Sequence, residues 1–311
     1  MSLDLEPDDA QQAIHDELAR FAAERCGEAL LKTQVDRFAV GLWRELAALG
    51  VLALATPEGD GGAAELCIAC EALGAAVFPG PICASVLAAQ ILLEAERRAV
   101  TAGRAIVSVG APPLMPFAPV ATLFLALDGD RIHRATPRGE VVPHATLGGE
   151  PWGRVELELG EALPASDRVF AVHDVAFAAY TAAAGAALVA RAAEHARTRR
   201  QFGRAIGEFQ AVSHPLADCA IRSDAARILA RAAACAIDAD EPDAAIRAAA
   251  ARLSARAAAL DAAHTAHQIF GAQGIAIEGP VFHLSRRIRQ LASQPPGDLR
   301  ARAAVLAPYA A

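Results

Sequence analysis

The C-terminal half of the sequence is built from long alanine-rich segments, and this feature constrains the fold more than any other. Segments with the helical spacing of apolar residues run from about residue 173 to 200, 209 to 238, 242 to 270 and 280 to 292. Alanine has the highest helix propensity, and its small side chain lets helices pack at short interaxial distances. The sequence therefore predicts a tight helical bundle in this half of the chain.

The pattern of apolar and polar residues changes twice along the chain. Up to about residue 104, amphipathic helical segments, the first over 9–31, alternate with turns such as the glycine-rich stretch at 56–62. From 105 to 168, apolar and polar residues alternate as in strands, and Asp128-Gly129-Asp130 marks a hairpin turn. We therefore expect a mostly α protein with an N-terminal helical domain (1–104), a small middle β domain (105–168) and a C-terminal helical bundle (169–311).

Composition narrows the class of protein. The 311 residues are 54% hydrophobic and 21% charged, which excludes a disordered chain. The 29 basic and 36 acidic residues give a net charge of −7, so we expect no nucleic-acid binding. The longest smooth apolar stretch, Val175 to Ala190, is shorter than the roughly 18 residues that span a bilayer. Without a secretion signal at its start, the sequence predicts a cytoplasmic protein with no membrane insertion.

Cysteine and histidine pairs point to packing rather than to metal or redox chemistry. Cys67 and Cys70 have the spacing of a redox pair, but they lie inside a helical pattern, so we interpret them as core residues. His264 and His267 are three residues apart on a predicted helix and would share one face. No third ligand accompanies them, and we predict no metal site.

Two glycine-containing motifs follow predicted bundle helices. The first runs from Arg199 to Val212 (RRQFGRAIGEFQAV) and continues as SHPLAD. The second runs from Gln268 to Gly274 (QIFGAQG) and is followed by Glu278, Pro280 and Arg286. In this order they resemble the acyl-CoA dehydrogenase family, whose pattern is R-x-Q-F-G…FQ and then Q-x-x-G-G-x-G…E-x-P…R. The stretch LAALGVLALATPEGDGGAAELCIACEALGAA looks more loosely like the entry domain of that family.

The resemblance implies the family's fold, including a C-terminal four-helix bundle, and its chemistry. Arg199, Gln201 and Phe202 would reach the FAD of a neighbouring subunit, while Gln268 and Gly271 would hold its nucleotide end. The substrate would be an acyl-CoA thioester. The partners would be a related subunit, in a dimer or heterotetramer, and an electron-transfer acceptor.

The chemistry of these residues supports that reading, because a pyrophosphate needs cations and N–H donors and glycines let the backbone approach it. Two purely structural alternatives stay open. Arg199 would be a cation placed favourably at a helix C-terminus, and Gln268 with Gly271 would form a helix stop.

The catalytic carboxylate of the family removes the α-proton of the thioester, and its usual loop position is Pro295 here. Proline has neither a carboxylate nor a backbone N–H, so this position is inactive. Asp298 would replace it only after a loop shift. Some family members place the base at the start of the long helix before R-x-Q-F-G, and counting back predicts Asp174 as the catalytic base. Helix capping by Asp174 and a base at His173 are the alternatives.

The middle domain departs from the family pattern. It lacks the T-E-x-x-x-G-S-D-like loop and the W-I-T/S strand that lie against the flavin ring in the family. It resembles short members that form one half of heterotetramers, where unlike subunits share flavin sites and the acyl pocket accepts bulky steroid-derived groups. The leading expectation is an FAD-dependent acyl-CoA dehydrogenase subunit that desaturates such a thioester between its α and β carbons. The alternative is a non-catalytic scaffold subunit that completes a partner's flavin site.

Overall fold

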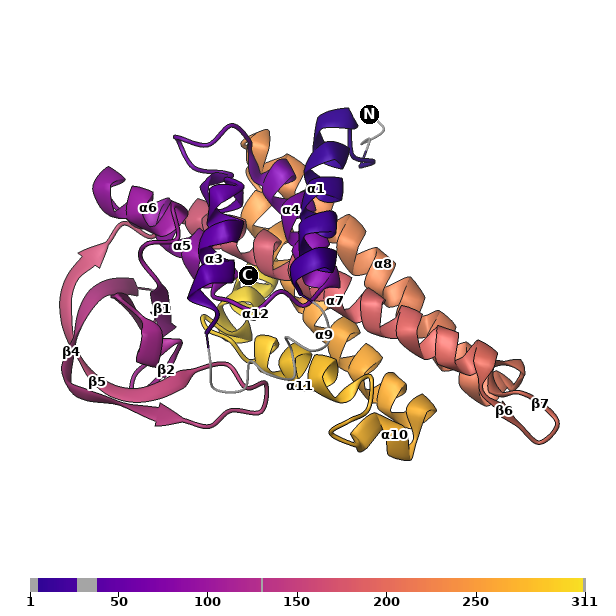
Figure 1. Ribbon diagram of the computed structural model, residues 1–311. Coiled ribbons are helices and arrows are strands. Elements are labelled where there is room, and N and C mark those ends of the chain that lie inside the picture. Colours follow the sequence, from indigo (N-terminus) through magenta and orange to yellow (C-terminus); the bar gives the residue numbers. More distant parts are fainter. Residues whose placement is uncertain (1–4, 27–37, 130, 310–311) are drawn as a thin grey trace.

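Helices precede and follow a small β-sheet along the chain in the computed structural model, which describes residues 5–26, 38–129 and 131–309 (Figure 1). The N-terminal helices are α1 (Asp9–Arg25), α3 (Val40–Ala48), α4 (Ala63–Ala75), α5 (Ile82–Ile91) and α6 (Glu94–Thr101). The Asp8 carboxylate caps α1 by accepting a hydrogen bond from the backbone N–H of Gln11 at 2.8 Å. The part of the first predicted helix over 27–31 lies outside the described residues.

The middle of the chain forms a five-stranded sheet. Its strands are β1 (Val107–Gly110), β2 (Leu114–Pro116), β3 (Leu123–Asp128), β4 (Arg131–His144) and β5 (Trp152–Leu163), in the order β1-β3-β4-β5-β2. β1 and β3 are parallel, and the other neighbours are antiparallel. Asp128 pairs with Arg131, so the predicted hairpin is present, although Asp130 lies outside the described residues. Apolar side chains on the two faces of the sheet belong to separate buried clusters.

The C-terminal part is the predicted bundle. Its helices are α7 (Asp167–Thr198), α8 (Gln210–Asp238), α9 (Ala244–Phe270), α10 (Ala272–Ile275), α11 (Phe282–Leu291) and α12 (Asp298–Leu306). α7, α8 and α9 pack against one another, and α11 contacts both α7 and α9. A Cβ added to Gly185 of α7 would lie 3.0 Å from the Cα of Ala259 in α9, so small residues do bring these helices close together. The mostly α fold with a small central sheet is confirmed.

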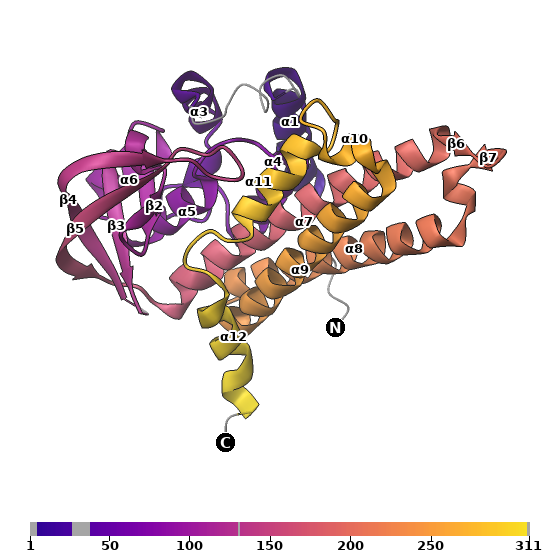
Figure 2. The same ribbon diagram turned by 90° about the horizontal axis from the view of Figure 1, so that it is seen from below.

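A hairpin of β6 (Arg200–Gln201) and β7 (Arg204–Ala205) joins α7 to α8. Figures 1 and 2 show this hairpin at one end of the bundle and the five-stranded sheet at the other. α12, which the sequence analysis did not predict, packs against α9.

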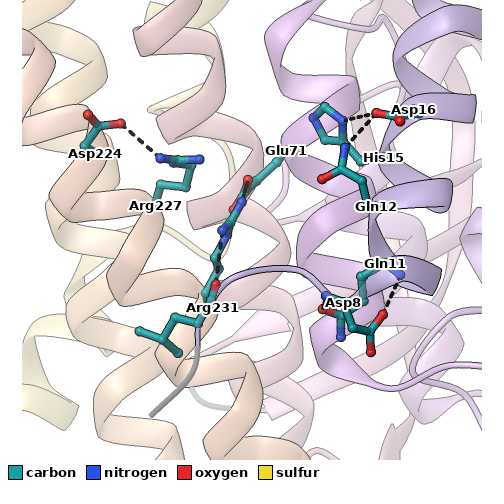
Figure 3. A network of polar contacts seen from close by, with 10 residues as sticks. Asp8, Gln11, Gln12, His15, Asp16, Glu71, Asp224, Arg227 and Arg231 are labelled. Atoms are coloured by element: carbon teal, nitrogen blue, oxygen red, sulfur yellow. Dashed lines mark hydrogen bonds and ion pairs between the residues drawn. The ribbon is translucent and has the colours of Figure 1, made fainter. Parts of the chain in front are cut away.

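Polar contacts join the N-terminal helices to the bundle. Asp238, at the end of α8, accepts hydrogen bonds from the backbone N–H groups of Ala63 and Ala64 at 2.8 and 2.9 Å, and so caps α4. Arg231 of α8 donates to both carboxylate oxygens of Glu71 in α4, at 2.8 and 2.7 Å (Figure 3). These contacts hold the N-terminal helices on the bundle in one arrangement.

Two features that could suggest other classes of protein belong to the core. α7 is long and apolar enough to cross a membrane, but 78% of its most apolar window is buried inside the protein. Cys67 and Cys70 are buried free thiols of α4, and burial raises the pKa of each. A raised thiol pKa keeps a cysteine protonated and unreactive.

Candidate functional site

The first motif forms an exposed turn at the tip of the β6–β7 hairpin. Phe202 and Gly203 occupy the turn with φ of 51° and 81°. A positive φ suits glycine but is strained for an aromatic residue. Phe202 is also 91% exposed, and its ring meets that of Phe209 edge-on, with the centroids 6.1 Å apart. A strained and exposed aromatic residue marks this turn as a candidate contact site.

Positive charge surrounds this turn. Arg199 follows the last residue of α7, Arg200 donates to the carbonyl of Gly203 at 3.3 Å, and Arg204 lies over the ring of Phe209 at 4.0 Å. None of the three arginines forms an ion pair with a carboxylate of the described residues. The hairpin therefore presents uncompensated cations to solvent.

Gln201 lies on the same hairpin. Its side-chain amide donates to the carbonyl of Arg200 at 2.6 Å, and the residue is exposed. The three residues that the motif assigns to a neighbouring flavin, Arg199, Gln201 and Phe202, thus share one exposed surface.

The second motif lines an open cavity. Gln268 and Gly271 border a space of about 480 Å³, together with His264, His267, Ile275 and Arg289. Gly271 ends α9 with φ 57° and ψ −132°, a conformation that glycine alone adopts readily. A Cβ placed there would meet no atom within 4 Å, so open space reaches the backbone. A ligand can therefore approach the main chain at this point.

The two motifs lie at the same end of the bundle. The ring of His195, near the end of α7, stacks on the ring of Phe270, the last residue of α9, with 4.2 Å between centroids. However, Arg199, Gln201 and Phe202 do not line the cavity beside Gln268. Within one chain the two motifs therefore form separate surfaces.

Asp174 lies in the buried interior of α7. The helix starts after Ser166, so Asp174 does not cap it. Its side chain has no exposed surface and pairs with three partners: Arg252 Nη1 at 3.3 Å from Oδ1, His173 Nδ1 at 3.3 Å from Oδ1, and Arg300 Nη2 at Oδ2. The carboxylate is therefore enclosed by donors from α7, α9 and α12.

These contacts set the protonation of Asp174. Burial acts to raise its pKa, but the hydrogen bond from His173 and the charges of Arg252 and Arg300 outweigh burial, so the pKa lies below the usual value. Burial lowers the pKa of His173, which stays neutral. A general base works best with a pKa near neutrality and direct access to its substrate. The surroundings of Asp174 are those of a structural ion pair, and its assignment as catalytic base stays a prediction.

The loop that carries the catalytic glutamate in the family is packed against the rest of the protein here. Pro295 packs against the end of β1, where a Cβ added to Gly110 would lie 3.4 Å from Pro295 Cγ. Asp298, the first residue of α12, lies 3.2 Å from Nε of Arg256 and 3.7 Å from Nε of Arg252. The alternative carboxylate in this loop is therefore held in ion pairs as well.

The sequence analysis missed one buried carboxylate. Glu150, between β4 and β5, is 2% exposed and accepts hydrogen bonds from Gln294 at 2.8 Å, Gln290 at 3.2 Å and Arg287 at 3.4 Å. Burial raises its pKa, and Arg287 offsets part of this effect. The one local signal was an acidic residue inside a glycine- and proline-rich turn. Its contacts fix the β4–β5 loop onto α11 and the segment that follows it.

No group of three or more His, Cys, Asp or Glu side chains that could hold a metal ion occurs within 5–26, 38–129 and 131–309. The Nε2 atom of His267 contacts Ser285 Oγ at 2.7 Å. His264 and His267 both line the cavity beside Gln268.

The fold and the site together define a class of protein. The bundle has a hairpin at one end and a sheet at the other, and a cavity lined by a cation lies beside Gly271 at the end of α9. Residues 8–98 match the N-terminal domain of acyl-CoA dehydrogenases, and residues 165–293 match their C-terminal domain. The acyl-CoA dehydrogenase IpdE2 of Mycobacterium tuberculosis is 30% identical over 239 residues, which cover 71% of this chain and 74% of the relative. The chain belongs to the acyl-CoA dehydrogenase family.

Solved structures agree on the fold. The ChsE4-ChsE5 complex from Mycobacterium tuberculosis contains a chain with 25% sequence identity and a TM-score of 0.82, and the match covers 99% of both chains. A variant of the Tcur3481-Tcur3483 steroid ACAD matches with 23% identity and a TM-score of 0.81 over 96% of both chains. The small central sheet and the bundle are thus found together in these proteins.

The residues present fit a flavin dinucleotide. The cavity beside Gln268 is lined by a cation, two imidazoles and an amide, and no carboxylate is among its lining residues. Gly271 adds open space at the backbone, where its own N–H already donates to the carbonyl of His267 at 3.0 Å. Such a surface suits the phosphates of FAD.

Proposed function

We propose that this chain is one subunit of an FAD-dependent acyl-CoA dehydrogenase, that it completes a flavin site shared with a related partner subunit, and that the partner supplies the catalytic base. When bound, FAD would supply the acceptor for the hydride that leaves the β-carbon of the acyl-CoA thioester. The residues of this chain bind and orient the cofactor. Gln268 and Gly271 hold its nucleotide end, and Arg199, Gln201 and Phe202 extend to the flavin of the neighbouring subunit.

The state of Asp174 carries this proposal. Its side chain is fully buried, and two arginines and a histidine occupy its oxygens. A base must touch the α-carbon proton, and a pKa held low by two guanidinium groups weakens proton abstraction. Pro295 removes the alternative in the loop. A scaffold subunit needs neither group to react.

The second candidate function retains Asp174 as the base of a site within this chain. In that case Arg252 and Arg300 would have to leave the carboxylate before the substrate entered. The position of Asp174 in the first third of α7, the long helix before R-Q-F-G, favours this candidate, because some members of the family carry their base near the start of that helix.

The substrate we propose is a CoA thioester with a bulky, steroid-derived acyl group. Two observations support this substrate. The middle domain is small, with a sheet of five strands, and the Tcur3481-Tcur3483 protein of similar fold is a steroid ACAD. Electrons would leave the reduced flavin to an electron-transfer acceptor. A cytoplasmic location stays a prediction.

Co-purification with a partner subunit tests the proposal. The chain alone, the partner alone and the assembly are compared for visible flavin absorbance and for acyl-CoA turnover. We expect flavin in the assembly and no turnover by this chain alone. Flavin and turnover in the isolated chain would overturn the proposal.

The variant Asp174→Asn distinguishes the two candidates. We expect its assembly to keep turnover per bound flavin. Loss of turnover per bound flavin, in an assembly that remains folded and keeps its flavin at the assay temperature, would favour the catalytic candidate instead.

A further inference from the structure

One arginine of α11 borders two cavities. Arg289 lines the 480 Å³ cavity that contains Gln268 and Gly271. It also lines a second cavity of about 200 Å³ between α11 and the sheet, where Trp152 and Gln290 are among its neighbours. Figure 2 shows α11 running from the region of α10 toward the β4–β5 hairpin. Arg289 can therefore contact a ligand in either cavity.

The charge of Arg289 is uncompensated. Arg289 is half-buried, yet its guanidinium forms no hydrogen bond or ion pair with any residue in the described part of the chain. Neighbouring arginines behave differently, since Arg287 pairs with Glu150 at 3.4 Å and Arg256 pairs with Asp298 at 3.2 Å. A half-buried guanidinium without a carboxylate is a ready anion site.

The rest of the lining strengthens this positive character. No Asp or Glu lines either cavity. The polar groups beside Arg289 are His264, His267 and Gln268 on one side, and hydroxyl and amide groups of Thr146, Gln290 and Ser293 on the other. The imidazoles and the Gln268 amide can donate hydrogen bonds to phosphate oxygens. The hydroxyl and amide groups on the other side already donate to acceptors within the protein, so Arg289 is the charged donor there.

We propose that Arg289 binds the pyrophosphate of the flavin dinucleotide, a role that neither glycine motif assigns. This inference rests on the proposed flavin site, and it adds a second cation, from the chain that also supplies Gln268, to the Arg199 that reaches across the subunit boundary. The planar guanidinium fork can donate to oxygens of both phosphates at once, which a point charge does less well. A flavin without phosphate has nothing for it to bind.

The test uses the flavin-stripped assembly with its partner subunit. FAD, ADP and riboflavin are each titrated into the wild type and into the variants Arg289→Gln and Arg289→Lys. The control variant is Arg302→Gln, which removes an exposed cation from α12. Binding is followed by calorimetry and flavin fluorescence. Arg289→Gln should weaken FAD and ADP by about 10- to 100-fold, the worth of hydrogen bonds to a charged group, and should leave riboflavin unchanged.

The other variants and the salt dependence sharpen the outcome. Arg289→Lys should recover part of the affinity, and Arg302→Gln should bind as the wild type. The decrease of FAD affinity with salt should be steeper in the wild type than in Arg289→Gln. Equal FAD affinity in wild type and Arg289→Gln would overturn the inference and leave the flavin site intact. A wild-type assembly that binds no FAD would overturn the proposed function together with it.

Discussion

The two ends of α7 carry residues that family motifs single out, and their surroundings are opposite. At the sheet end, Asp174 has no exposed surface and three bound partners. At the hairpin end, Phe202 is 91% exposed and the arginines around it have no carboxylate partner among the described residues. Satisfied buried charges contribute to the fold, whereas unsatisfied exposed groups remain available for a ligand or partner. We therefore propose that the hairpin end is the functional end of this chain.

The largest effect on stability should come from Asp174→Asn, which disrupts the buried ion pairs at the sheet end of α7. A neutral amide cannot compensate Arg252 and Arg300, which would remain buried with their charge. Removing one partner of a buried ion pair costs about 3–5 kcal/mol. Urea unfolding should show a loss of this size in the free energy of unfolding.

Asp224→Asn is the matched control, because Asp224 is exposed and pairs with Arg227 at 3.3 Å across the surface of α8 (Figure 3). Exposed pairs of this kind contribute about 0–1 kcal/mol. Similar losses in the two variants would contradict the closed, structural role of Asp174.

The same carboxylate predicts a pH dependence of defined sign. Its pKa in the folded protein lies below its usual value, which is about 3.9 in an unfolded chain. Its stabilising contribution is complete above the unfolded pKa and is lost as the pH falls through the folded pKa. The stability difference between wild type and Asp174→Asn should be constant from about pH 8 to 5 and should narrow below about pH 4. Unfolding at a series of pH values measures it, and a difference that widens in acid would reverse the assignment.

At the open end, Phe202→Ala should separate stability from assembly. The side chain packs little within its own chain, so the isolated protein should unfold at an unchanged urea concentration. Aromatic anchors at interfaces are worth about 2 kcal/mol or more, so flavin retention by the assembly should weaken about 30-fold.

Tyr309→Ala provides the control, because Tyr309 follows α12, is 83% exposed and belongs to neither glycine-containing motif. Equal retention of flavin in both variants would show that the hairpin does not reach the cofactor.

Local sequence pattern predicted the elements well, because helix and strand periodicity is a property of neighbouring residues. The long segments predicted at 209–238 and 242–270 correspond to helices at 210–238 and 244–270. α12 was missed because it follows Pro295 and Pro296 and is short. Without α12 there was no reason to place Arg300 beside Asp174.

The site was predictable only where its residues are consecutive. The motifs at Arg199 and Gln268 could be recognised, and each occupies one surface. The partners of Asp174 and Glu150 come from distant helices, and ion pairing of this kind depends on tertiary packing rather than on spacing. Burial raises the pKa of Glu150, whereas the hydrogen bond from His173 and the charges of Arg252 and Arg300 outweigh burial and lower the pKa of Asp174.

The smallest expected effect comes from Gly271→Ala, compared with Gly41→Ala in α3. Neither added methyl group would meet an atom within 4 Å, so crowding is the same in both. Gly271 has φ 57° and ψ −132°, and alanine there should lower the free energy of unfolding by about 1–2 kcal/mol through backbone strain alone. Gly41 lies in a helix without positive φ, so alanine should raise stability by about 0.5–1 kcal/mol. Urea unfolding should therefore give opposite signs, and a shared sign would mean that the backbone conformation of Gly271 does not disfavour alanine.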